Sequence, residues 1–229
     1  MRRATIVAAV ALGLCVASVP GRTSAQVRAG VPLSSIAPAG MSLLWAQAPD
    51  TRDGPARVAF ASMGAQSPQL VVDVWVTVDA RAARRRAAAV LDTMTHELSA
   101  ITALGDRAWG DAGLVVLVRD NVTVLVRALG GGRGALATAA HIDAALRAAP
   151  AGAPRPGAPS VIFASAPQVG VPVPIRVRGD VVGVHVSVDG DGYARRTRAG
   201  WVLTRTGEGP FALRVVVVDS MLRVAVVAE

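Results

Sequence analysis

A stretch of twelve residues, Ala148–Pro159, constrains the fold most strongly, because apart from Arg155 it contains only proline, alanine and glycine. Proline lacks an amide donor, and alanine and glycine bury little surface, so such a stretch favours an extended spacer. We place a linker at residues 150–159, between a first domain at 26–149 and a second at 160–229. Both lengths are plausible for separate domains, and we expect proteases to cut at the linker.

The first domain mixes strands and helices. Strands are expected over Leu43–Gln47, Ala56–Ala61 and Leu70–Val78, and the last of these alternates valine with other residues in the period-two pattern of a strand. Asp79 stands where a helix N-cap belongs. Apolar residues then recur at helical spacing from Ala80 to about Ile101, which predicts one long helix.

After the turn at Leu104-Gly105-Asp106, two strand-like runs, Gly113–Val118 and Val122–Arg127, flank Asp120-Asn121. Asp and Asn tolerate left-handed turn geometry, so a hairpin is predicted. A helix over Ala135–Ala148 closes the domain. The predicted order is β-β-β-α-β-β-α, an α+β fold.

The second domain consists almost entirely of short strand-like runs separated by turn residues. In about 70 residues this pattern indicates an all-β sandwich. The predicted strands are Val161–Ala164, Val173–Arg178, Val181–Val188, Tyr193–Arg196, Trp201–Thr206, Phe211–Asp219 and Leu222–Val227.

Alternation within these runs predicts which side chains are buried. Trp201 and Leu203 are expected to face the core together with the apolar face of the Phe211 strand, and Leu222 is expected to share a face with Val224 and Val226. Arg214 and Arg223 are expected to point to solvent.

The run from Pro172 to Val188, then Trp201 and the closing Phe211–Val227 hairpin resemble the Ig-like β-sandwich modules of bacterial exported proteins, without a cysteine pair. The Leu104–Ala108 turn followed by the Leu117–Val124 hairpin resembles the α+β domains of small bacterial surface lipoproteins, over roughly residues 56 to 149. Both resemblances imply envelope proteins with a binding role or no assigned role, and neither implies a reaction.

Residues 1–25 have the parts of a Sec signal peptide: Arg2 and Arg3, an apolar stretch, and small residues before a cleavage site near Ala25/Gln26. The apolar stretch is shorter than the ~20 residues that a membrane span needs. A lipid on Cys15 is the alternative, although Leu14 is larger than the residue expected before a lipidated cysteine. We therefore expect a periplasmic or secreted protein with no integral membrane span after cleavage.

The positive charge does not indicate nucleic-acid binding. From Gln26 onward the chain has 21 arginines and 16 acidic residues, and it has no lysine. Arginine, alanine, valine and glycine richness without lysine is typical of GC-rich bacterial genomes. No nucleic-acid partner is expected.

Two motifs are incomplete. Gly130–Ala135 fits a phosphate-binding loop by spacing, but the strand before it belongs to a predicted antiparallel hairpin, whereas such loops follow a strand of a βαβ unit. His96-Glu97 begins a zinc-protease pattern whose second histidine is replaced by Ala100. A flexible connection and an ordinary helix surface are the simpler interpretations.

Other candidate ligands are scattered. The remaining histidines, His141 and His185, lie in different predicted elements, and His185 is expected to face solvent. Asp189 and Asp191 begin a calcium-loop pattern, but Tyr193 stands where a further oxygen ligand is needed. No metal or cofactor is predicted.

Two features are candidates for binding. Arg84-Arg85-Arg86 is either a solvated helix face or a surface for an acidic envelope polymer. Trp75 lies opposite the valine face of its strand, so it faces either a second layer or a ligand; Trp45, Trp109 and Trp201 are the other tryptophans.

Two function classes remain open. The leading hypothesis is a non-catalytic envelope protein with a binding or assembly role, whose partner is an envelope protein or a cell-wall or surface polymer. The alternative is an extracytoplasmic, hydrolase-like enzyme. A cleft that gathers Asp73, Asp106 or His96 favours the enzyme, and we predict no catalytic residues.

Overall fold

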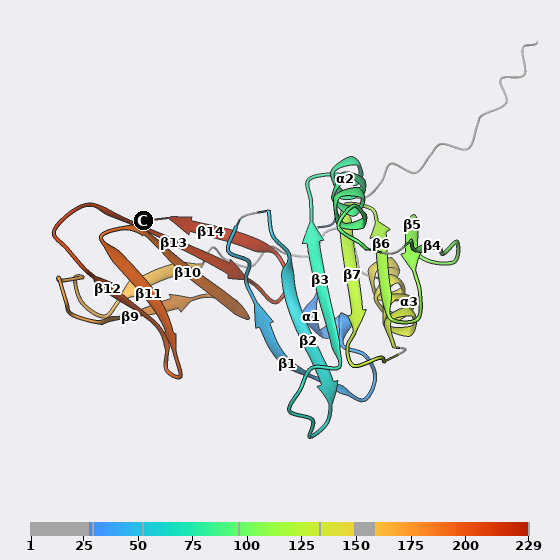
Figure 1. Cartoon of the computed structure of the whole chain (residues 1–229), viewed down its shortest axis with the longest axis horizontal. Coiled ribbons are helices and arrows are strands. Elements are labelled where there is room, and N and C mark those ends of the chain that lie inside the picture. Colours follow the sequence, from blue (N-terminus) through green and yellow to red (C-terminus); the bar gives the residue numbers. More distant parts are fainter. Residues whose placement is uncertain are drawn as a thin grey trace, which may run out of the picture.

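The computed structural model describes residues 28, 30–51, 53–95, 97–132, 134–148 and 159–228. The expected signal peptide at 1–25, nearly all of the expected linker at 150–159, His96 and Arg133 lie outside the described residues. What is described consists mostly of antiparallel sheets with a few helices (Figure 1).

One seven-stranded antiparallel sheet dominates the first half. Its central strands are the ones with the clearest valine alternation, and each is hydrogen-bonded to antiparallel neighbours on both sides. In spatial order the strands are β1 (Met41–Gln47), β2 (Ala56–Ser62), β3 (Leu70–Val76), β7 (Val122–Ala128), β6 (Leu114–Arg119), β5 (Arg107–Gly110) and β4 (Ser99–Ala100).

Helices cover both faces of this sheet. Helix α2 (Ala80–Leu91) packs through Ala83, Ala87 and Val90 against Val116, Val118 and Leu125. Helices α1 (Leu33–Ile36) and α3 (Ala135–Ala148) pack on the opposite face, where the larger core cluster lies. The alternation of β3, β6 and β7 therefore supplies two cores, one on each side.

Helix α2 is much shorter than predicted, and the expectation of a helix to Ile101 is wrong. The helix ends at Leu91, and Asp92 and Thr93, two weak helix formers, follow it. The Thr93 hydroxyl donates to the Val90 carbonyl, 2.7 Å away, which closes the last turn. Met94 and Leu98 still pack against the same core from a non-helical segment, and Ser99 and Ala100 pair with β5.

The hairpin and the last helix of this half are confirmed. Arg119 pairs with Val122, so Asp120 and Asn121 form a two-residue turn, and Asp120 has a φ of +54°. Helix α3 spans the predicted residues. Strands β4 and β5 were not predicted.

The second half contains the seven predicted strands: β8 (Ser160–Phe163), β9 (Val173–Arg178), β10 (Gly183–Gly190), β11 (Gly192–Thr197), β12 (Gly200–Arg205), β13 (Phe211–Val218) and β14 (Val224–Ala228). They form two antiparallel sheets, β11-β12-β9-β8 and β10-β13-β14. Side chains of both sheets share one core cluster that includes Ile175, Val186, Leu203 and Val215.

Trp201 and Arg214 lie as expected. Trp201 is half-buried against this cluster, and its indole Nε1 donates to the Val184 carbonyl, 3.2 Å away. Arg214 is exposed. Arg223 differs from the prediction, because it is only 20% exposed and its guanidinium lies 2.7 Å from the Asp219 carboxylate.

Strand β14 begins later than predicted. Leu222 lies in the preceding turn with a φ of +51°, so it does not share a strand face with Val224. Its side chain is fully buried in the core of the first half, together with Val216 and Val218 of β13. Residues Val215–Val218 of β13 are thus buried on both faces, which explains this unbroken run of four valines.

The two halves meet along this hairpin. The amides of Val31 and Leu33 donate to the carbonyls of Met221 and Ser220, at 2.7 and 2.8 Å. Gly30 lies so close to this turn that a Cβ there would come within 2.6 Å of the Met221 oxygen. The division into domains at 26–149 and 160–229 stays a prediction, now with a defined contact between them.

Candidate functional site

Asp73, a candidate for catalysis, lies in an ion-pair group across three neighbouring strands. Its side chain is 2% exposed, and its two oxygens accept from Arg57 Nε at 2.6 Å and Arg127 Nη2 at 2.7 Å. The hydrogen bond with Asp73 raises the pKa of the Arg57 guanidinium above its ordinary value. Asp73 therefore joins β2, β3 and β7.

Asp106, the second candidate, is bound at another position. One oxygen accepts from Arg119 Nη1 at 3.0 Å, and the other accepts from the backbone amide of Asp120 at 2.7 Å. Asp106 therefore fixes the turn before β5 to the β6–β7 hairpin. No hydrogen bond joins it to Asp73 within the part of the chain that is described.

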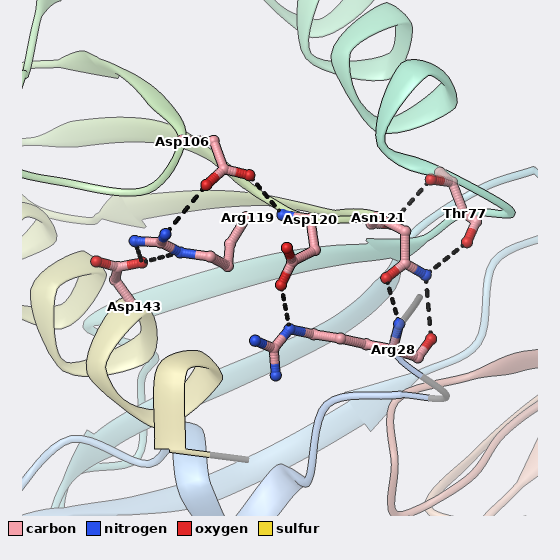
Figure 2. Close-up of polar contacts among 7 residues, drawn as sticks. All are labelled: Arg28, Thr77, Asp106, Arg119, Asp120, Asn121 and Asp143. Carbon is pink, nitrogen blue, oxygen red and sulfur yellow. Dashed lines mark hydrogen bonds and ion pairs between the residues drawn. The ribbon is translucent and has the colours of Figure 1, made fainter. Parts of the chain in front are cut away.

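Asn121 belongs to a partly buried polar cluster that we call the hairpin network, shown in Figure 2. Its Oδ1 accepts from the Arg28 amide at 2.6 Å, and its Nδ2 donates to the carbonyls of Arg28 and Thr77 at 3.0 and 2.7 Å. The Arg28 guanidinium also donates to Asp120, 2.8 Å away. The hairpin turn thus holds the beginning of the described chain. The network consists of Arg28, Thr77, Asp106, Arg119, Asp120, Asn121 and Asp143.

Asp143 brings helix α3 into the hairpin network. It is 1% exposed, accepts from Arg119 Nε at 2.8 Å, and pairs with Arg147 one helical turn later. Burial is the largest single influence and acts to raise the pKa of this carboxyl. Hydrogen bonds from Arg147, Arg119 and the Gly105 amide, together with the Arg119 charge, outweigh it and lower the pKa below its ordinary value.

The remaining sequence candidates are not brought together. Strand β7 is antiparallel to both neighbours, so the Gly130–Ala135 loop lacks the parallel context of a nucleotide site. Asp191 accepts from the Gly209 amide at 2.9 Å and thus stabilises a turn. Among the described residues, no group of three His, Cys, Asp or Glu side chains is arranged to hold a metal.

His185 is half-buried, contrary to the expectation that it faces solvent. Its ring lies edge-on to Trp201, with 5.7 Å between ring centres. It lines a cavity of about 320 Å³ together with Asp50 and Arg57. No hydrogen bond joins His185 to Asp50 within the described residues.

A larger groove of about 930 Å³, which we call the helix groove, lies between helix α2 and the start of β14. It combines the two features that the sequence indicated for binding, Trp75 and the arginine run. Its lining residues are Asp53, Gly54, Trp75, Val76, Thr77, Val78, Ala82, Arg85, Arg86, Ala89, Arg223 and Val224.

Three segments far apart in the sequence position these side chains. Asp79 caps α2 by accepting from the Ala82 amide at 2.6 Å, which fixes the helix directly after β3. Val78, which is 79% exposed, lines the helix groove together with Trp75. Arg223 belongs to the second half of the chain, and nothing in the sequence predicted that it would lie near α2.

The arginines of the helix groove differ in their partners. Arg223 is bound by Asp219. Within the described residues, the guanidinium groups of Arg85 and Arg86 have no carboxylate or hydrogen-bond partner, and Arg85 is exposed. Arg84, on the same helix, does not line the groove.

No described helix combines the length and the apolar character needed to cross a membrane. No protein-family model matches the chain, and the searches of curated proteins and of solved structures likewise found no match.

Proposed function

We propose that this chain is an exported, non-catalytic protein of the bacterial envelope with a binding or assembly role. Arg2 and Arg3, the apolar stretch after them and the small residues before Gln26 support export through the Sec pathway. Cleavage near Ala25/Gln26 then leaves Arg28 close to the new N-terminus, where it enters the hairpin network.

The observation that carries the binding role is the helix groove. Trp75 and two arginines that have no carboxylate or hydrogen-bond partner among the described residues line one concave surface. Desolvated ion pairs hold a fold together, whereas charged groups left open in a groove attract an oppositely charged partner. The groove therefore suits an anionic envelope protein or surface polymer.

The candidates for catalysis support the same proposal. Asp73 and Asp106 accept hydrogen bonds from arginines at two different places in the fold, where they join strands and turns. A general acid or base needs access to a substrate proton, and Asp73 is nearly inaccessible. These contacts support a stabilising role for both carboxylates, in agreement with a non-catalytic protein.

For residues 160–229 we propose an Ig-like β-sandwich. Seven short antiparallel strands in two sheets with a shared core support it, and so does Trp201 packed against that core. Modules of this kind commonly present binding surfaces, which agrees with the binding role.

The test is affinity capture from an envelope extract with the mature protein as bait. We expect a partner that is retained by the wild type and by Arg84→Gln and is lost with the double variant Arg85→Gln/Arg86→Gln. Capture that is equal for all three proteins would contradict the helix groove as the binding surface.

Export is tested separately by mass spectrometry of the protein from its native host. An N-terminus near Gln26 is expected. An intact Met1, or a lipid on Cys15, would contradict the proposed export and cleavage.

A further inference from the structure

We propose that the helix groove binds a linear polysaccharide that carries carboxylate groups, an inference that rests on the proposed binding role. Three properties of the groove favour such a ligand: the character of its charges, the nature of its apolar wall and its size.

The charge of the helix groove is positive but modest. Arg85 and Arg86 have no protein partner in the described residues, Arg223 already shares its charge with Asp219, and Asp53 contributes a negative charge. Asp53 opposes any polyanion, and it opposes a densely charged one such as polyphosphate most strongly, which would also find too few cations in the groove. A polymer with one carboxylate per sugar unit matches two separate guanidinium groups, each of which binds a carboxylate through two parallel hydrogen bonds.

The apolar wall suits sugar rings better than peptide side chains. Trp75 is half-buried and packs against the α2 core, and the rest of its indole contributes to the wall of the groove. The other apolar lining residues are small: Val76, Val78, Ala82, Ala89 and Val224. Peptide recognition through a groove depends on pockets for large anchoring side chains. A sugar ring needs only a broad apolar surface for its C–H face and polar groups at its edge, which the indole and the arginines supply.

The size of the groove fits several units of such a chain. Its volume of about 930 Å³ lies near the top of the roughly 300–1,000 Å³ range of small-molecule sites. Val78, 79% exposed, adds to the apolar wall of the groove. A polymer thus has room to lie along α2 with Arg85 and Arg86 in contact with successive carboxylates.

The experiment is titration of the mature, full-length protein with polygalacturonate, followed by isothermal calorimetry and by Trp fluorescence. The same titration is repeated with Arg84→Gln, with Arg85→Gln/Arg86→Gln, and with dextran as a neutral polysaccharide. Arg84→Gln removes one arginine from the same helix without touching the groove, so it controls for general attraction of a polyanion. Thermal unfolding of each variant verifies that the fold is retained.

We expect binding of polygalacturonate and none of dextran. Affinity should fall at least about tenfold in Arg85→Gln/Arg86→Gln, because two charge-assisted contacts are lost, and by less than about twofold in Arg84→Gln. The inference would be overturned if Arg84→Gln lost as much affinity for polygalacturonate as Arg85→Gln/Arg86→Gln, or if the wild type did not bind polygalacturonate.

Polyphosphate and poly-glutamate are further arms of the titration. If either binds more tightly than polygalacturonate and depends on Arg85 and Arg86, the polysaccharide is excluded as the preferred ligand, while the proposed binding role stands. If affinity capture from the envelope also finds no partner that depends on these arginines, the proposed role fails as well.

Discussion

Arginine has different surroundings in the hairpin network and in the helix groove. In the network, Arg28 and Arg119 are 7% and 17% exposed, and each lies within 3.0 Å of a carboxylate. In the groove, Arg85 and Arg86 have no partner among the described residues. In a chain whose basic residues are all arginine, the local partner rather than the residue type decides the role. Network arginines should therefore affect stability, and groove arginines should affect binding.

Asp143→Ala is expected to have the largest effect on stability. The substitution removes a carboxylate that is 1% exposed and leaves Arg119 without its nearest counter-charge, although Asp106 remains. Breaking a buried ion pair typically costs about 3–5 kcal/mol, so we expect a loss near the lower value. Chemical denaturation of the mature protein measures it.

Arg147→Gln is the control for this substitution. Arg147 binds the same carboxylate but is 57% exposed, so its removal should cost less than about 1 kcal/mol. If Asp143→Ala unfolds at the wild-type denaturant concentration, the hairpin network does not anchor α3.

Asn121→Ala is expected to have the next largest effect. It leaves the buried Arg28 amide and two carbonyls without their partner, and an unsatisfied buried group costs about 1–3 kcal/mol. We expect a loss of about 2 kcal/mol by denaturation, with faster hydrogen exchange at the Arg28 amide. Unchanged exchange at that amide would contradict the role of Asn121 in holding the N-terminal segment.

The lowered pKa of Asp143 predicts a smaller, pH-dependent effect. A carboxyl with a lowered folded-state pKa stabilises the fold above its unfolded pKa of about 3.9, and this contribution is lost as the pH falls through the folded value. The stability difference between the wild type and Asp143→Asn should therefore be constant near neutral pH and shrink below about pH 4. A difference that stays constant down to the lowest measurable pH would show that the charge of Asp143 contributes nothing.

Sequence reasoning was most successful where one short segment determines the structure. The Asp79 cap, the Asp120-Asn121 turn and α3 depend on neighbouring residues, and all three are confirmed. The predicted end of α2 was wrong, because Met94 and Leu98 have helical spacing along the chain but pack against the same core from a non-helical segment. The spacing of apolar residues indicates which side chains are buried, but here a helix and an irregular segment bury side chains in the same core.

Contacts between distant segments were beyond sequence reasoning. Leu222 has the spacing of a strand residue, yet its turn inserts it into the core of the other half. Trp75 and the arginine run were separate candidates, and only the folded chain places them in one groove with Arg223. The partners of Asp73 and Asp106 were missed for the same reason, since ion pairs between strands have no fixed spacing along the chain.

The smallest expected change in stability belongs to Arg85→Gln/Arg86→Gln, and this variant tests the central claim most directly. Both residues lie on α2 without ion pairs in the described structure, so the free energy of unfolding should change by less than about 0.5 kcal/mol. The measurement combines denaturation with capture of the envelope partner by the same preparation. We predict an unchanged denaturation midpoint and loss of capture; a lowered midpoint with capture retained would show that these arginines stabilise the fold instead of binding a partner.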